Sequence, residues 1–297
     1  MKRFFLICVL SGFIFSGCGK DEEPQEEPQE EPKKEQVQDV MVYLSTGSFS
    51  NTGPESTVIS NESQISKLIL FGVDDKNKFI TAFPIITNPS MTGIKLTVPI
   101  EVKTIHAIAN PTLTIESINL STFSDIFNLT CNFTTAPTAP FIMSGKGSVS
   151  SARANIELLR IVAKIEVVAH NDFVIESITV KKTPDKGYVF KKETSEPPTS
   201  ASVSYPANTT NFIVYVAENT KNNPSEFEVA GKYRGQPVSY PIVLENNGSA
   251  VNIVRNVRYQ INITESNDED CTFTITMPAW EDINADNYII PREKNTF

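Results

Sequence analysis

Apolar and polar residues alternate with a period of two along much of this chain. In residues 94–103 and 257–264 every second residue is apolar, and residues 272–277 repeat the pattern near the C-terminus. Alternation of this kind is typical of half-buried β-strands with one face in water. Residues 246–248, Asn-Asn-Gly, lie between two β-rich runs and suit a tight hairpin. The pattern predicts an all-β protein of the β-sandwich class, and not an α/β enzyme.

The run IELLRIVAKIEVV, residues 156–168, fits either a helix or a strand. As a helix, it would carry Glu157, Arg160 and Lys164 on one polar stripe. As a strand, it would present an unbroken apolar face at every second residue from Leu159 to Val167. The density of β-branched residues favours the strand. A strand of this length could serve two sheets, so we expect a domain boundary inside it.

The length of the chain predicts two folded domains. About 260 of the 297 residues follow residue 36, which is more than one compact core usually holds. We expect an N-terminal β-sandwich at residues 37–160 and a C-terminal β-sandwich with a C-terminal tail at residues 161–297. Two short helices are expected as insertions, at residues 62–70 and 121–127, where Ser121 could cap the first turn.

The N-terminus has the layout of a secretory signal. Lys2 and Arg3 precede the apolar run 4–15, which is shorter than the roughly 20 residues of a membrane span. The sequence Phe-Ser-Gly-Cys at residues 15–18 resembles the lipobox of bacterial lipoproteins. This resemblance implies that residues 1–17 are removed and that Cys18 carries acyl chains that hold the protein on a membrane. An ordinary cleaved signal peptide with an incidental Cys18 is the alternative.

Residues 18–36 are expected to form a disordered acidic tether. They repeat Glu-Glu-Pro-Gln and contain too few apolar residues to offset the entropy of ordering. Lys20, Asp21, Glu22 and Glu23 resemble the export signal of Bacteroidetes lipoproteins, which implies the outer leaflet of the outer membrane and a surface-exposed body. The alternative is that any acidic linker would look the same.

The charge of the chain argues against nucleic acid as a partner. The formal net charge is −9, and residues 21–35 contribute eight acidic residues against two lysines. Residues 36–297 contain 27 acidic against 21 basic residues, so the body is also mildly acidic and has no basic excess to suggest a polyanionic ligand.

The sequence gives little support for catalysis, a metal or a cofactor. His106 and His170 are the only histidines, and we expect both to be structural. The carboxylate-rich stretches 74–77 and 267–270 are most simply solvated turns, with weak calcium binding as the alternative. A surface glycosidase would need two carboxylates paired in one cleft and stays a third functional class. We expect no cofactor and no enzymatic activity.

The cysteines after residue 36 and the single tryptophan are expected to have structural roles. Four cysteines are too few for a disulfide scaffold, and a bridge between Cys131 and Cys271 is the less favoured alternative to two free thiols. Trp280, the only tryptophan, is expected to anchor the last sandwich and not to stack a sugar.

A family resemblance extends over nearly all of the expected mature chain. Residues 141–180, FIMSGKGSVSSARANIELLRIVAKIEVVAHNDFVIESITV, are similar to the fimbrillin pattern, in which Met-Ser-Gly leads into an Arg-x-Val-Ala-Lys-Ile strand. Further motifs follow the expected order: IHAIANP (105–111), NFIVYVAENT (211–220), GKYRG (231–235), IVRNVRYQINI (253–263) and MPAW (277–280). The resemblance is to the pilus subunits of Bacteroidales. It implies two tandem β-sandwiches of the Greek-key or transthyretin-like type, lipoprotein export, strand-exchange assembly with other pilus subunits, and adhesion.

The resemblance also bears on the role within a pilus. In stalk subunits of this family an arginine follows the first strand. A trypsin-like protease cuts there, which removes that strand. Residues 35–66, which contain the predicted first strand at 41–45, hold no Lys or Arg. We therefore expect the strand and the lipid to stay, as in a membrane-retained anchor or accessory subunit.

Two segments are candidates for strand exchange. Met41 and Tyr43 belong to the predicted first strand, and Ile283, Tyr288 and Ile290 belong to a short C-terminal segment expected to pair with a neighbouring subunit. The alternative for that segment is an edge strand of the chain's own second sandwich. The alternative for the whole protein is a cell-surface lipoprotein that binds glycans of unknown identity, which would require exposed aromatic side chains.

Overall fold

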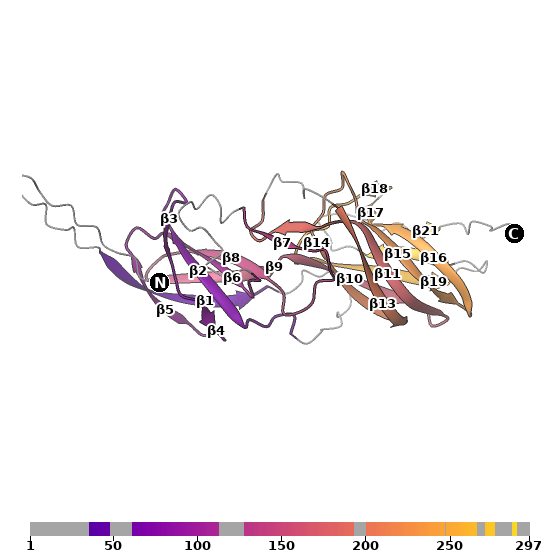
Figure 1. The fold of residues 1–297 in the computed structure, drawn as a ribbon, viewed down its shortest axis with the longest axis horizontal. Helices are drawn as coiled ribbons and strands as arrows, with labels where there is room; N and C mark the ends of the chain where they lie inside the picture. Colours follow the sequence, from indigo (N-terminus) through magenta and orange to yellow (C-terminus); the bar gives the residue numbers. More distant parts are fainter. Residues whose placement is uncertain are drawn as a thin grey trace, which may run out of the picture. The chain divides into compact units, whose positions relative to one another are not determined.

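The structure, a computed structural model, describes residues 36–47, 61–112, 128–192, 200–246, 248–265, 271–276 and 287–289. Within these ranges every regular element is a β-strand and there is no helix (Figure 1). The predicted all-β class is therefore confirmed. No helix in the described part of the chain is long and apolar enough to cross a membrane. The signal peptide, Cys18 and the tether lie outside the described residues, so these assignments and the domain bounds stay predictions.

The N-terminal strands form one sheet path that bends over a core. Along this path the order is β3-β2-β6-β8-β9-β1-β5, with β4 paired to β2. The bounds are β1 (Val37–Thr46), β2 (Lys67–Val73), β3 (Phe79–Ala82), β4 (Ile86–Thr87), β5 (Ile94–Pro99), β6 (Thr104–Ala109), β8 (Met143–Ser148) and β9 (Arg153–Arg160). Buried side chains from β1, β5 and β9 share one hydrophobic cluster with those from β2, β6 and β8. We call this unit the N-terminal sandwich.

The path bends where β8 meets β9. Only two residue pairs join these strands, Met143 with Arg160 and Ser144 with Leu159. Beyond them the two backbones approach so closely that a Cβ atom on Gly145 would lie 2.1 Å from the carbonyl oxygen of Glu157. Glycine is required there because no other residue leaves room for that approach.

The C-terminal strands form two facing sheets, which we call the C-terminal sandwich. One sheet has the order β14-β10-β19-β20-β21 and the other β13-β11-β15-β16. The bounds are β10 (Val162–Ala169), β11 (Phe173–Pro184), β13 (Ser200–Thr209), β14 (Asn211–Ala217), β15 (Glu226–Tyr233), β16 (Gln236–Val243), β19 (Arg258–Glu265), β20 (Cys271–Thr276) and β21 (Asn287–Ile289). Two small pairs complete the fold: β7 (Thr130–Asn132) with β12 (Lys186–Tyr188), and β17 (Glu245–Asn246) with β18 (Ser249–Ala250).

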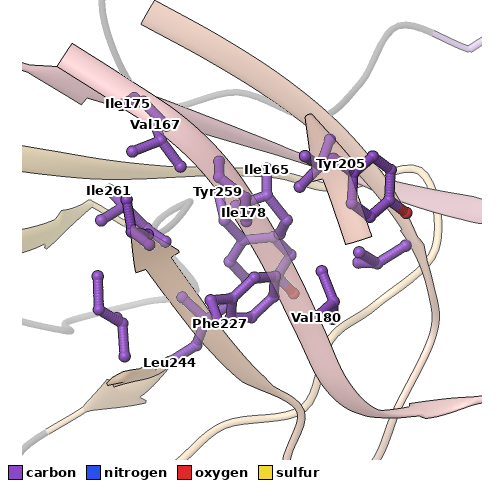
Figure 2. Packing of buried hydrophobic residues seen from close by; sticks show 14 of the residues in the cluster. Ile165, Val167, Ile175, Ile178, Val180, Tyr205, Phe227, Leu244, Tyr259 and Ile261 are labelled. Atoms are coloured by element: carbon purple, nitrogen blue, oxygen red, sulfur yellow. The ribbon is translucent and has the colours of Figure 1, made fainter. Parts of the chain in front are cut away.

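Alternating apolar residues from both sheets fill the core of the C-terminal sandwich. Figure 2 shows Ile165 of β10 and Ile261 of β19 packed near Ile178 and Phe227 of the opposite sheet. These four side chains have no exposed surface. The predicted apolar face of residues 257–264 is confirmed, because Tyr259, Ile261 and Ile263 are all buried, but Arg258, which was predicted on the wet face, is buried as well.

Both sandwiches place their first strand in the same position. In the N-terminal sandwich β1 pairs antiparallel with β5 and parallel with β9. In the C-terminal sandwich β10 pairs antiparallel with β14 and parallel with β19. The first strand of each sandwich is thus a central strand with neighbours on both sides.

The strand interpretation of residues 156–168 is confirmed, but the predicted apolar face is wrong for its first half. The run forms two strands, β9 and β10, separated by Ile161. In β9 the buried side chains are Ala154, Ile156, Leu158 and Arg160, whereas Leu159 is 36% exposed. The prediction failed because it treated the run as one strand, whereas the break at Ile161 separates β9, which has one buried face, from β10, which is covered on both faces.

The predicted helix at residues 62–70 is wrong. Residues 61–63 form a turn, and residues 67–70 begin β2. Leu68 and Leu70 face the core of the N-terminal sandwich, while Ile69, Phe71 and Val73 enter a second cluster on the other face. A strand buried on both faces has no period of two, so its apolar run resembles that of a buried helix. The second predicted helix, at 121–127, lies outside the described residues.

Three smaller predictions can also be compared with the structure. The Asn-Asn-Gly hairpin is confirmed, because β17 and β18 pair across it and Gly248 has a positive φ of 72°. The alternation from residue 94 is confirmed as far as Val98, after which Ile100 lies in a turn and is 41% exposed. The predicted strand at residues 272–277 is confirmed by β20.

Candidate functional site

The first strand is built into the core of the N-terminal sandwich. It pairs with β5 from Val37 to Val42 and with β9 from Met41 to Thr46. The side chains of Val40 and Val42 have no exposed surface, and Leu44 is 6% exposed. Strand β1 therefore lies between β5 and β9 in the sheet (Figure 1). It also adds three alternate apolar side chains to the core.

The two residues that the sequence singled out in this strand lie on its other face. Met41 and Tyr43 are half-buried, and the guanidinium carbon of Arg153 lies 5.3 Å from the centre of the Tyr43 ring. The core-facing residues Val40, Val42 and Leu44 were missed, although their own period of two was visible in the sequence. The strand-exchange role of Met41 and Tyr43 stays a prediction.

A buried arginine holds the end of β1. Arg160, which is 2% exposed, donates from Nη1 to the carbonyl oxygen of Gly47 at 2.5 Å, directly after β1. It also donates from Nε to the carbonyl oxygen of Glu62 at 2.9 Å and from Nη2 to Oγ of Ser63 at 2.8 Å. One guanidinium thus contacts the residues on both sides of segment 48–60, which itself lies outside the described residues.

Further buried charges surround Glu62. Its Oε1 accepts a hydrogen bond from Nζ of Lys164 at 2.9 Å and another from the hydroxyl of Tyr215. Nζ of Lys164 lies 3.5 Å from Glu166, whose other carboxylate oxygen accepts from Nε of Arg258 at 2.8 Å. We call Glu62, Arg160, Lys164, Glu166, Tyr215 and Arg258 the buried polar cluster.

Burial dominates the electrostatics of this cluster. It raises the pKa of Tyr215, and the hydrogen bond to Glu62 raises it further. Burial also lowers the pKa of Arg160, an effect that the negative charge of Glu62 opposes. The phenol therefore stays a proton donor, and the guanidinium stays paired with acceptors that satisfy it.

Sequence reasoning missed the buried polar cluster. The helical alternative for residues 156–168 placed Arg160 and Lys164 on one polar stripe without partners for their charges, yet both are buried. The available signal was that charged residues interrupt a run that is otherwise apolar on both faces. Such residues need partners, and Glu62 and Arg258 supply them from distant parts of the chain.

The histidines occupy structural positions. His106 lies in β6, is 1% exposed, and packs edge-on against Phe190 with ring centres 5.5 Å apart. Burial lowers the pKa of His106 to about 4, with a smaller contribution from the charge of Lys146. Nδ1 of His170 accepts a hydrogen bond from the main-chain nitrogen of Asp172 at 3.3 Å in the turn between β10 and β11.

The other candidate residues for chemistry are also accounted for by structure. The described part of the chain contains no group of three His, Cys, Asp or Glu residues that could hold a metal ion. Asp74 closes a turn by accepting from the main-chain nitrogens of Lys76 and Lys78. Cys131 is a buried free thiol, and burial raises its pKa to about 11. The stretch 267–270 and Trp280 lie outside the described residues.

The C-terminal candidates are only partly described. Tyr288 lies in β21, opposite Phe273 of β20 in an antiparallel ladder within the chain's own sheet. Ile283 and Ile290 lie outside the described residues. This pairing agrees with the edge-strand alternative for residues 287–289, and donation of the segment to a neighbour stays a prediction.

Comparison with solved structures identifies the fold. The tip fimbrial protein Mfa3 of Porphyromonas gingivalis, with a C-terminal truncation, matches with a TM-score of 0.57 and 14% identity over 81% of this chain and 100% of that chain. A fimbrial assembly protein of Parabacteroides distasonis matches with a TM-score of 0.58 and 15% identity over 84% of this chain and 99% of that one. The chain has a fimbrillin-like fold.

Another protein with this fold is described by polysaccharide binding and not by a fimbrial role. A structure from Bacteroides thetaiotaomicron, described as a candidate polysaccharide-binding protein, matches with a TM-score of 0.51 and 11% identity over 86% of this chain and 99% of that chain. No protein-family model matches the sequence, and no curated protein matches it. At these levels of identity the similarity establishes the fold.

Proposed function

We propose that this protein is a structural component of a cell-surface pilus, retained at the outer membrane as an anchor or accessory subunit. The observation that carries the proposal is the position of β1, which follows the expected tether and is a central strand of the N-terminal sandwich. A central strand cannot leave without opening the core, so an uncut β1 joins the folded body firmly to whatever precedes it. Under the proposal, what precedes it is the lipid on Cys18.

The absence of cleavage sites supports retention of this strand. Residues 35–66 contain no Lys or Arg, so a protease of trypsin-like specificity has no site there. With β1 in place, the space between β5 and β9 is already filled by Val40, Val42 and Leu44. Such a subunit cannot accept a strand at this position and can only donate one. It would therefore end a strand-exchange polymer at the membrane.

Glycan binding is the second candidate function. It is motivated by the fold neighbour from B. thetaiotaomicron that is described as polysaccharide binding. Sugar platforms use exposed aromatic rings, and among the described residues the exposed large hydrophobic side chains are aliphatic: Val37, Ile85, Met91, Ile100 and Leu159. The described surface thus favours the pilus proposal. Retention of the protein on immobilised polysaccharides, at a level unaffected by loss of pilus subunits, would support the alternative.

Mass spectrometry of cell-surface fractions tests the proposed role. We expect peptides that join residues 41–66 to the tether, together with pilus subunits that co-purify with the intact protein. Recovery only of chains that begin beyond Ser45 would contradict the anchor role and indicate a processed stalk subunit. Recovery of the intact protein without any pilus subunit would contradict the pilus role itself.

Fractionation of variants tests the lipid separately. Cys18→Ala should move the protein from the membrane pellet to the soluble or secreted fraction, whereas Cys131→Ala, which removes a buried thiol, should leave it in the pellet. Pelleting of the Cys18→Ala protein after a carbonate wash would contradict lipid anchoring. Replacing residues 20–23 with alanine should reduce antibody labelling of intact cells and leave membrane association unchanged.

A further inference from the structure

Strand β1 is connected to β2 in two ways. One is the peptide chain of residues 48–60. The other is Arg160, which hydrogen-bonds to the carbonyl oxygen of Gly47 on one side of this segment and to Glu62 and Ser63 on the other. The two flanks are thus held to the same side chain independently of the covalent path between them.

The Arg160 side chain is itself fixed from a third direction. Oδ1 of Asn256 accepts from Nη1 of Arg160 at 3.0 Å and from its main-chain nitrogen at 3.3 Å. The flank at Glu62 is also fixed, because the Glu62 carboxylate accepts from Lys164 of β10 and Tyr215 of β14. Gly47 is therefore tied, through Arg160, to groups that belong to the C-terminal sandwich.

Release of β1 would disrupt this arrangement at a buried charge. If Gly47 left, the Arg160 guanidinium would lose one acceptor while the rest of its surroundings stayed closed around it. A buried charged donor that loses a partner is strongly unfavourable. Release would also break the main-chain pairing with β5 and β9 and expose the side chains of Val40 and Val42.

We propose that Arg160 is a latch that retains β1 after the chain is cut within residues 48–60. Proteolysis of that segment, by a protease of any specificity, then leaves the strand in place, and opening the site requires a second event that breaks the contact with Gly47. The inference deepens the proposed function, because it makes retention of the N-terminal strand a property of the folded core. It does not depend on the absence of a cleavage site alone.

A designed cut tests the latch directly. The recognition sequence of a site-specific protease is inserted between Asn51 and Thr52 of the full chain, with Cys18→Ala so that no lipid holds the fragment. After cleavage, size-exclusion chromatography with mass spectrometry follows the loss of the N-terminal fragment over time. We expect the fragment to stay bound in the parent protein and to leave at least tenfold faster in Arg160→Met.

The matched control is Arg153→Met. Arg153 is on the same strand, is exposed, and lies opposite Met41 of β1 with its guanidinium over the Tyr43 ring, so its loss removes a positive charge and one contact with β1 without touching Gly47. We expect the release rate of the fragment to rise by no more than about threefold. Equal acceleration by both substitutions would contradict the latch and indicate a general charge effect.

A milder variant covers the case in which Arg160→Met does not fold. Arg160→Lys keeps the positive charge but removes the guanidinium, whose separate nitrogens reach Gly47, Glu62 and Ser63 at once. Hydrogen exchange of the uncut protein should then show faster exchange of the Gly47 amide, which donates to the carbonyl oxygen of Leu158, with no change in β15 or β16. Unchanged exchange at Gly47, or immediate loss of the fragment from the cut parent protein, would overturn the proposal.

These measurements separate the latch from the proposed function. They use purified protein without membranes or pilus subunits, so loss of the fragment says nothing about a pilus role. Conversely, failure of the protein to co-purify with pilus subunits would leave the release rates, and the latch, unaffected.

Discussion

Nζ of Lys164 lies 2.9 Å from Oε1 of Glu62, and the two side chains are only 1% and 8% exposed. This ion pair joins β10 to a turn that precedes β2, across 102 residues of sequence. The same ammonium group also lies 3.5 Å from Glu166, whose other carboxylate oxygen is paired with Arg258.

Lys164→Met should therefore destabilise the protein strongly. It removes the ammonium group that pairs with the buried Glu62 carboxylate, and breaking a buried pair in this way costs about 3 to 5 kcal/mol of unfolding free energy. Urea denaturation measures the loss. The control is Lys95→Met, because the pair between Lys95 and Asp39 is 64% and 56% exposed and is screened by solvent, so its loss should have little effect. Similar losses of unfolding free energy in the two variants would show that the buried ion pair stabilises the protein no more than the exposed one.

The core position of β1 predicts a second effect on stability. Leu44→Ala should lower the free energy of unfolding by about 3 kcal/mol, because Leu44 is 6% exposed within the cluster of the N-terminal sandwich. Ser45→Ala, at the adjacent exposed position, should change it by less than about 0.5 kcal/mol. If Leu44→Ala were as mild as Ser45→Ala, β1 would not be part of the core in solution.

The burial of His106 predicts a dependence of stability on pH. Its pKa in the folded protein is lowered to about 4, below its ordinary value of 6.5, so the unfolded chain binds more protons between these values. Stability should fall as the pH drops from about 6.5 to about 4. The histidine should account for about 2 to 3 kcal/mol of that loss at pH 4.5.

Comparison of the wild type with His106→Leu isolates this contribution. Acidic groups with lowered pKa, such as Asp39 beside Lys95 and Glu228 beside Lys181, also lose stabilising contacts in acid, but they are present in both proteins. Urea unfolding at pH 7.0 and pH 4.5 should show a smaller loss in His106→Leu. Equal losses would mean that His106 is not buried in its neutral form.

The C-terminal segment predicts an effect on assembly. Deletion of residues 284–297 should give a folded, lipidated protein that no longer co-purifies with other pilus subunits. The matched control is deletion of residues 291–297, which keeps the whole candidate strand at 283–290 and should preserve co-purification. A lost thermal transition in the longer deletion would instead assign β21 to the chain's own core, in line with its pairing to β20.

The sequence by itself determined where strands with one wet face lie. Leu96 and Val98 in β5, and Tyr259, Ile261 and Ile263 in β19, are buried at the alternation that the sequence predicts. This works because the alternation of side chains along a strand is a local property of the backbone, independent of what the strand packs against. The hairpin between β17 and β18 was recognisable from three residues, because the backbone conformation of a tight turn is also a local property of the chain.

Tertiary structure alone decided which strands are covered on both faces and where the buried charges lie. Strand β2 resembled a helix because clusters on both of its faces bury it, and neither cluster is visible in a local window. Arg160 and Lys164 fell on one polar stripe in the helical alternative, yet both are buried, and the acceptors at Glu62 that allow this lie 98 and 102 residues away. Burial of a charge depends on a partner brought near by the fold, and the local residue pattern contains no record of that partner.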